Sequence, residues 1–470
     1  MTNSLSISRR NALRTLGAGA VAGTAMAGAP GVFTSHAADT SDYRALVCVF
    51  LFGGMDSHDV VIPFQQAEYD GWRSIRRSFV ARQGASRDRG SLLSLTRASR
   101  PPEEVPQHAL APELANIKAL YDSGDAAVVA NVGPLVEPVT RQAFEAGVAR
   151  LPPRLFSHND QQNTWQAGAP EGAQFGWGGL FADAVLASGG NSNRPQFTTI
   201  TTEEVGPFLT GRTAAPFRIG INGAAQVNIL EELADQADPA FVNAVRDQLA
   251  GRSFSGGNVI ERDIAAKLAA GLDSNDFYGQ ALASGMASGM ASFSGFGAGP
   301  LSAQLRAVAN TIAVRGQLSA SRQIFFVGLG GFDTHSAQAI DLPRLLRELD
   351  SGIAAFHSAM VSLGLSQQVT LFTASDFGRT LAVNGDGTDH GWGGHHFAIG
   401  GAVRGGEIYG DIPPATIGHD QEVGGGRLIP TLAVDQYAAQ LGRWFGLTPS
   451  ETASALPGLG RFTPPSWEFI

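Results

Sequence analysis

The feature that most constrains the fold is a series of short, continuously apolar runs separated by helical patterns. The runs are rich in β-branched and aromatic residues and are bounded by Gly or Asp, which is typical of strands covered on both faces. They span residues 45–52, 126–133, 197–202, 322–329 and 368–375. A helical apolar stripe from about Leu342 to Leu363 joins the last two runs. This order predicts an α/β fold with a mostly parallel central sheet and helices on both faces.

The chain has the size and composition of an ordinary globular protein. It contains 470 residues, of which 43% are hydrophobic and 16% charged. No internal repeat and no Pro-rich or charged linker divides it, so we expect a single domain over residues 39–470. The Gly-, Ala-, Ser- and Met-rich stretch 281–300 is expected to be a flexible loop, either a lid over a site or a plain insertion.

The N-terminus has the pattern of an export signal. Arg9 and Arg10 precede an Ala/Gly-rich apolar stretch, and small residues near Ala38 offer a cleavage site. This predicts a twin-arginine signal peptide over residues 1–38 and a periplasmic or secreted protein. A membrane anchor is the alternative, but the stretch is shorter and less hydrophobic than the roughly 20 apolar residues of a spanning helix. We expect no transmembrane segment in the mature chain.

Charge and cysteine content narrow the possible partners. Removing residues 1–38 removes three arginines and no acid, which takes the formal net charge from −9 to −12. An acidic protein without clustered Lys and Arg is not expected to bind nucleic acid. The single Cys48 lies in an apolar run, so it is expected to be a small buried residue and rules out a disulfide framework or a zinc–cysteine site.

Acidic residues, accompanied by His or Arg, follow three of the predicted strands. They are Asp56, His58 and Asp59 in "GGMDSHD", Asp333 and His335 in the near copy "GGFDTH", and Asp376 and Arg379 in "DFGRT". Ligands of parallel sheets bind beyond the carboxyl ends of the strands, so we expect these side chains to converge. Converging carboxylates repel one another unless a multivalent cation neutralises them. A turn or helix-cap role is the alternative for each Asp, and for Asp59 it is the preferred interpretation.

Histidines gather beside the same motifs. Six of the ten histidines do so: His58, His158, His335, His390, His395 and His396. A set of His and Asp favours zinc, manganese or iron over calcium. His395 and His396 cannot both point inward from one strand, and we prefer His395. We therefore expect one or two divalent metal ions, with ligands drawn from Asp56, Asp333, His335, Asp376, His390 and His395.

Two further residues are candidates for catalysis. Ser157 in "RLFSHNDQQNTWQ" is either the N-cap of a helix or a nucleophile at a helix N-terminus. No Gly-x-Ser-x-Gly motif surrounds it, so a nucleophilic Ser157 requires a metal for activation. Arg379, three residues after Asp376, either holds an anionic oxygen pair or forms a surface ion pair.

These motifs, taken in order, resemble a known family. The twin-arginine start, "FLFGGMDSHDVVIP", "LFSHNDQQNTWQ", "GGFDTH" and "SDFGRTLAVNGDGTDHGWGGHHFAIGGAVRGG" are similar to the secreted bacterial family called domain of unknown function 1501. That family is grouped with alkaline phosphatases and sulfatases. The resemblance thus implies an alkaline phosphatase-like fold, and metal ligands at Asp56, Asp333, His335, Asp376 and His390.

The resemblance also implies a function and shows two departures from the pattern. Alkaline phosphatases place a His where Phe377 stands here, and they separate the residues matching Asp333 and His335 more widely. The implied activity is hydrolysis of a phosphate or sulfate ester, with Ser157 as nucleophile and a small anionic ester as substrate. One rival is a non-catalytic exported protein with a structural metal centre that binds a partner protein. Another is a metal-dependent hydrolase without a covalent step.

Overall fold

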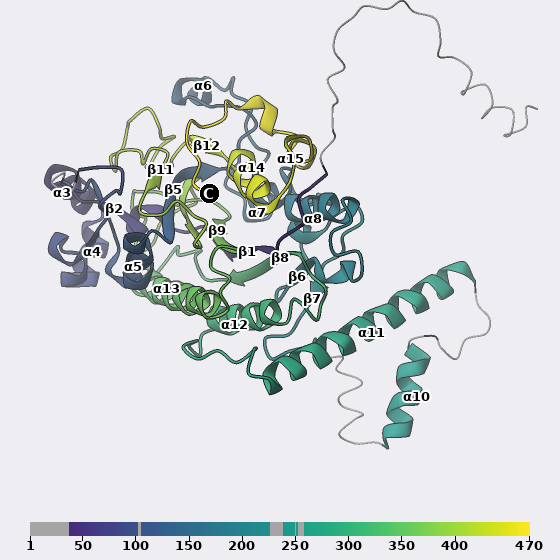
Figure 1. The fold of residues 1–470 in the computed structure, drawn as a ribbon. Helices are drawn as coiled ribbons and strands as arrows, with labels where there is room; N and C mark the ends of the chain where they lie inside the picture. Colours follow the sequence, from purple (N-terminus) through teal and green to yellow (C-terminus); the bar gives the residue numbers. More distant parts are fainter. Residues whose placement is uncertain (1–36, 102–104, 226–237, 250, 252–257) are drawn as a thin grey trace, which may run out of the picture. The chain divides into compact units, whose positions relative to one another are not determined.

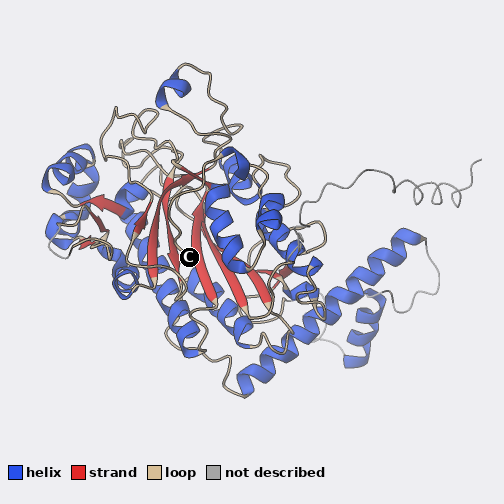
Figure 2. Cartoon of the chain, turned by 45° about the horizontal axis from the view of Figure 1, so that its top comes forward, coloured by secondary structure: helices blue, strands red, loops and turns tan. Residues whose placement is uncertain are grey.

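A nine-stranded sheet is the central element of the computed structural model, which describes residues 37–101, 105–225, 238–249, 251 and 258–470. The strand order is β11-β5-β10-β9-β1-β8-β6-β7, and β12 also pairs with β5 (Figures 1 and 2). The strands are β1 Arg44–Leu51, β5 Ala126–Gly133, β6 Thr199–Thr201, β7 Phe217–Arg218, β8 Arg322–Leu329, β9 Val369–Ser375, β10 Gly394–Ile399, β11 Ile408–Tyr409 and β12 Leu432–Ala433. All five predicted strand runs are therefore strands, the run at 197–202 being shortened by a 3₁₀ turn at Pro195–Phe197.

The sheet is mixed, which corrects the expectation of a mostly parallel sheet. β1 pairs in parallel with β8 and β9, but β10 is antiparallel to both β5 and β9. The physical reason is the connection between β9 and β10, residues 376–393 of the described chain, and this connection contains no helix. A parallel return needs a long crossover, usually helical, whereas a loop that folds back brings the next strand in antiparallel.

Helices cover both faces of the sheet, as expected (Figure 2). The helices of the described chain are α2 Ser57–Val60, α3 Gln66–Ile75, α4 Arg77–Gln83, α5 Ala115–Ser123, α6 Arg141–Glu145, α7 His158–Ala167, α8 Trp177–Ala187, α10 Pro239–Leu249, α11 Val259–Ala287, α12 Pro300–Ala313, α13 Gln338–Ser362, α14 Val434–Phe445 and α15 Pro449–Ala455. The predicted stripe helix corresponds to α13, which begins four residues earlier than its apolar stripe. A small second sheet pairs β4 His108–Leu110 with β2 Val61–Pro63 and β3 Leu93–Ser94.

Alternation along β1 divides the core into two layers. Val47 and Val49 pack in the layer formed with α5, α12 and α13, whereas Leu46, Cys48 and Phe50 pack in the layer formed with α7, α8 and α14. Successive residues of a strand point to opposite faces, so a strand covered on both faces must be apolar throughout. Cys48 is free and buried, as expected.

The remaining expectations on domain organisation have different outcomes. The low-complexity stretch is not a loop throughout, because residues 281–287 form the end of α11, with Ala281, Leu282 and Gly285 buried. Ala and Met favour a helix, and burial of this turn against the core outweighs its Gly and Ser content. The proposed signal peptide lies almost wholly outside the described residues. In the part of the chain that the structure describes, no helix is both long enough and apolar enough to cross a membrane.

Candidate metal centre

Three strands end side by side at the edge of the sheet that carries the acidic motifs. The parallel register of β1 places Leu51 beside Leu329 of β8 and Ser375 of β9. The loops after these strands therefore begin at the same level. Gly53, with φ of 112°, packs so closely on the backbone of Asp333 that a Cβ atom would clash, so the two Gly-Gly loops are in direct contact.

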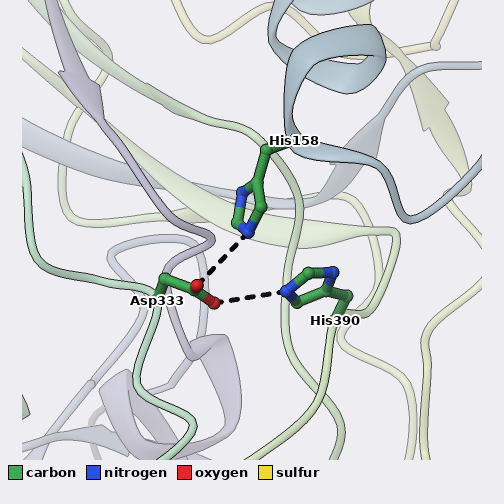
Figure 3. A group of neighbouring side chains, drawn as sticks. All are labelled: His158, Asp333 and His390. Atoms are coloured by element: carbon green, nitrogen blue, oxygen red, sulfur yellow. Dashed lines mark hydrogen bonds and ion pairs between the residues drawn. The ribbon is translucent and has the colours of Figure 1, made fainter.

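Three side chains from distant segments form a compact group at this edge. They are His158 at the start of α7, Asp333 after β8 and His390 in the connection to β10 (Figure 3). One ligand atom from each lies within 4.8 Å of the other two. His158 Nε2 is 3.4 Å from Asp333 Oδ2, and His390 Nε2 is 3.2 Å from Asp333 Oδ1. Two imidazoles and a carboxylate at these distances match the ligands of a catalytic zinc site.

Hydrogen bonds fix which ring nitrogen of each histidine faces the carboxylate. His158 Nδ1 donates to Asp376 Oδ2 at 2.7 Å, and His390 Nδ1 donates to the carbonyl oxygen of Phe156 at 2.7 Å. A neutral imidazole with Nδ1 protonated carries its lone pair on Nε2. His158 Nε2 is buried and has no hydrogen-bond partner among the described residues. Such an orphaned nitrogen beside a carboxylate is what a metal ligand looks like without its ion.

Asp376 lies behind His158 and outside the group of three. Its Oδ2 accepts hydrogen bonds from His158 Nδ1 and from Gln162 Nε2, the latter at 2.8 Å. The side chain is completely buried. The hydrogen bond to Asp376 raises the pKa of His158, an effect that outweighs desolvation and is reinforced by the charges of Asp376 and Asp333. A carboxylate in this position orients the imidazole and increases its basicity toward a metal.

His335 borders the group on its solvent side. Its Nε2 is 2.8 Å from His390 Nε2 and 3.0 Å from Asp333 Oδ1, and its side chain is 47% exposed. Because His390 Nε2 carries a lone pair, His335 Nε2–H is the donor between the two rings. The sequence predicted His335 as a metal ligand; it contacts Asp333 and His390 but is not one of the three residues that form the group.

Arg379 positions Asp333 and is buried beneath the group of three. The guanidinium is 1% exposed and donates to Asp333 Oδ1 at 2.9 Å, to the carbonyl of Gly53 at 2.9 Å and to Thr388. Burial raises the pKa of Asp333, but the hydrogen bond and charge of Arg379 outweigh this and lower it. The expectation that Arg379 holds an anionic oxygen pair is not supported by this geometry, since the guanidinium is buried and directed at protein oxygens.

Phe377 forms the apolar wall of the group. Its ring centroid is 4.9 Å from that of His158 and 4.6 Å from that of His390. The residue that differs from the alkaline phosphatase pattern thus packs directly on two candidate ligands. An apolar ring at this position offers no ligand for a second ion on that side.

The loop before α7 is strained where it meets the group. Arg154 and Phe156 adopt positive φ values of 48° and 76°. Such conformations cost about 1–3 kcal/mol each for residues other than glycine. The carbonyl of Phe156 accepts the His390 hydrogen bond, so the strained backbone supports the orientation of a candidate ligand.

Asp56 lies in a different environment from the other predicted ligands. Its carboxylate forms a completely buried ion pair with Arg76 and also accepts hydrogen bonds from Gln338 Nε2 and the backbone N–H of His58. These contacts use the lone pairs of both oxygens. Burial acts to raise the pKa of Asp56, and the charge and hydrogen bonds of Arg76 lower it overall. The structure therefore does not place Asp56 among the metal ligands.

His395 also lies apart from the group. It is on β10, where its Nδ1 accepts a hydrogen bond from the backbone N–H of Asn131 at 3.0 Å. Burial lowers its pKa well below the ordinary value. Its neighbour His396 points to the other face of the strand and packs against Trp165 at 4.9 Å. The sequence correctly predicted that the two side chains point to opposite faces of the strand. It also predicted His395 as a metal ligand, but neither histidine belongs to the group of three.

Ser157 is the N-cap residue of α7, and its hydroxyl donates to Asp160 Oδ2 at 3.0 Å. This bond turns the hydroxyl toward its own helix. The residue brought into the group is instead the next one, His158, which the sequence reasoning counted among the clustered histidines but did not select as a ligand. Its signal was the tight run of polar side chains in "SHNDQQ", which opens a helix directly over the strand ends.

Comparisons with known proteins identify a family and no function. A family described as "Protein of unknown function (DUF1501)" matches residues 43–453. No curated protein matches the chain. Two solved structures are distantly similar, titled as Ps i-CgsB alone and in complex with k-i-k-neocarrahexaose. They share 11% and 9% identity with TM-scores of 0.37 and 0.34, over 90% of this chain and 77% of theirs.

Proposed function

Because this chain belongs to the DUF1501 family, whose function is unknown, we propose a function from its site: an exported metal-dependent hydrolase of a phosphate or sulfate ester. His158, Asp333 and His390 would bind one divalent ion, zinc, manganese or iron, and His335 would contact it from the solvent side. The export route would be the twin-arginine pathway, which leads to the periplasm or the exterior.

The orientation of the two imidazoles carries this proposal. Both have their Nδ1 protons committed to oxygen acceptors, so both Nε2 lone pairs face the carboxylate of Asp333. Without an ion, one of these nitrogens is buried and unsatisfied. A divalent metal bound there polarises an ester oxygen and lowers the pKa of a coordinated water.

The surrounding residues hold this arrangement and leave one side open. Asp376 keeps the proton on His158 Nδ1, and Arg379 fixes the carboxylate of Asp333. Phe377 closes the inner side, whereas the exposed ring of His335 marks the side from which a substrate enters. One ion fits this set better than two, because Asp56 and Arg76 neutralise each other and Phe377 is not a ligand.

The position of Ser157 favours attack by water over a covalent step. Its hydroxyl is bonded to Asp160 and is not aimed at the group of three. The choice of a phosphate or sulfate ester, a small anionic substrate, follows from the resemblance to alkaline phosphatases and sulfatases. The metal is the electrophile that such a substrate needs, since Arg379 is buried.

The test is turnover of 4-nitrophenyl phosphate and 4-nitrophenyl sulfate by protein loaded with zinc, manganese or iron(II). We expect turnover that depends on the metal and that falls by more than about 100-fold in Asp333→Asn. Loss of a residue that only hydrogen-bonds to a metal ligand costs about 10–100-fold, and loss of a ligand itself should cost more. Asp341→Asn is the matched control, because its side chain is 42% exposed against 43% for Asp333. Ser157→Ala should retain turnover.

Two results would contradict the proposal. If Ser157→Ala abolishes turnover while metal binding persists, a covalent mechanism replaces attack by water. If no ester turns over with any metal, and Asp333→Asn greatly lowers the melting temperature, the metal only holds the loops together. The protein would then be the non-catalytic exported protein, binding a partner.

A further inference from the structure

A second cluster of histidines lines a pocket that the metal centre does not use. His58, His108 and His395 come from α2, β4 and β10 and border a pocket of about 260 Å³. Its other walls include Pro413 and Pro414. None of its lining residues belongs to the group of His158, Asp333 and His390. A pocket of this size is close to the lower limit for small-molecule sites and holds far more than one water.

Backbone hydrogen bonds fix two of the three imidazoles in complementary forms. Asn131 N–H donates to His395 Nδ1, so His395 carries its proton on Nε2 and offers a donor. His58 Nε2 donates to the carbonyl of Gly426 at 3.0 Å, so its Nδ1 is an acceptor. His108 Nδ1 is buried and has no partner among the described residues. His395 and His58 thus give the pocket a ring donor and a ring acceptor, and His108 lines its wall.

The charge of the pocket excludes anions. The charged residue among its lining residues is Glu68, and no Lys or Arg lines it. Burial lowers the pKa of His58 and of His108 to about 4, so both rings are neutral near pH 7. A phosphate or carboxylate would meet an acid and neutral rings, with nothing to replace its hydration.

The geometry also argues against a metal ion. Within the described chain, these three imidazoles are not among the side-chain groups placed to hold a metal ion. The walls instead present proline rings, which have no N–H and offer C–H surface. A hydroxyl group both donates and accepts a hydrogen bond, which matches an alternation of imidazole donor and acceptor.

We propose that the pocket lined by His58, His108 and His395 binds an uncharged sugar unit. The imidazoles would hydrogen-bond to its hydroxyls, and the proline rings would pack against its C–H face. This site is independent of the proposed metal and of hydrolysis.

The test is histidine-selective ¹⁵N and ¹³C labelling of the full chain, with titration of D-glucose and D-galactose followed by NMR. One or both sugars should shift the resonances of His58, His108 and His395, whereas His396, on the other face of β10, stays unchanged. Ala415→Trp fills the pocket and should weaken binding at least about tenfold, or about 1.4 kcal/mol. Thr416→Trp, at an exposed neighbouring position outside the lining, is the matched control and should bind normally.

The titration of the unchanged protein decides the matter even if Ala415→Trp does not fold. Absence of any shift with both sugars overturns the proposal. So do shifts of the same three histidines with inorganic phosphate or zinc but not with sugar, which would make the pocket an anion or metal site.

Discussion

Two near copies of one motif have opposite roles in this molecule. Gly-Gly-Met-Asp-Ser-His follows β1 and Gly-Gly-Phe-Asp-Thr-His follows β8, and the two loops touch. Asp56 of the first copy is buried and neutralised by Arg76. Asp333 of the second is 43% exposed and lies between two imidazoles. The motif places a carboxylate at the end of a strand, and residues from elsewhere in the chain decide what that carboxylate does.

The largest effect on stability should come from replacing Asp56, the buried carboxylate of the first motif. Asp56→Ala leaves Arg76 buried without a counter-charge, and we expect the free energy of unfolding to fall by about 3–5 kcal/mol. Asp333→Ala also removes a counter-charge from a buried guanidinium, that of Arg379, but Arg379 keeps the carbonyls of Gly53 and Thr388 as acceptors and Asp333 is 43% exposed, so the loss should be smaller. Urea denaturation followed by circular dichroism measures both. Equal losses of unfolding free energy in the two variants would show that Asp56 and Asp333 contribute equally to stability, which contradicts this comparison.

His58, which ends the first motif, should make the stability of the protein depend on pH. Burial lowers the pKa of His58 to about 4 from an ordinary 6.5, so the unfolded chain takes up a proton before the folded chain does. The contribution of neutral His58 is complete above pH 6.5 and is lost as the pH falls toward 4, at most about 3 kcal/mol. Unfolding free energies measured across this range should fall less steeply in His58→Gln. A matching slope in the variant would mean that His58 is not buried in its neutral form.

The sequence predicted the fold better than the chemistry of individual residues. Continuous apolar runs require strands covered on both faces, so the strands at 322–329 and 368–375 were identifiable from local pattern. The loop that carries His390 also reverses β10, and no local pattern reports that. Likewise Arg76, distant in sequence from Asp56, is the residue that removes Asp56 from the site. Long-range pairing of this kind cannot be read from motif spacing.

A smaller effect is expected from the carboxylate behind the site. Asp376→Asn retains shape but loses the charge that keeps the proton on His158 Nδ1. Metal affinity should fall by about 10–100-fold, with little change in fold. Isothermal titration with zinc measures this loss. A complete loss of binding, as severe as in Asp333→Asn, would instead make Asp376 a direct ligand, as the sequence first suggested.

The most direct test of the central claim is the metal content of the purified, metal-loaded and dialysed protein, measured by elemental analysis. The account predicts about one divalent ion per chain in the unchanged protein and in Asp341→Asn, and none in Asp333→Asn. Equal metal content in the unchanged protein and Asp333→Asn, or no metal in the unchanged protein after loading, would contradict it.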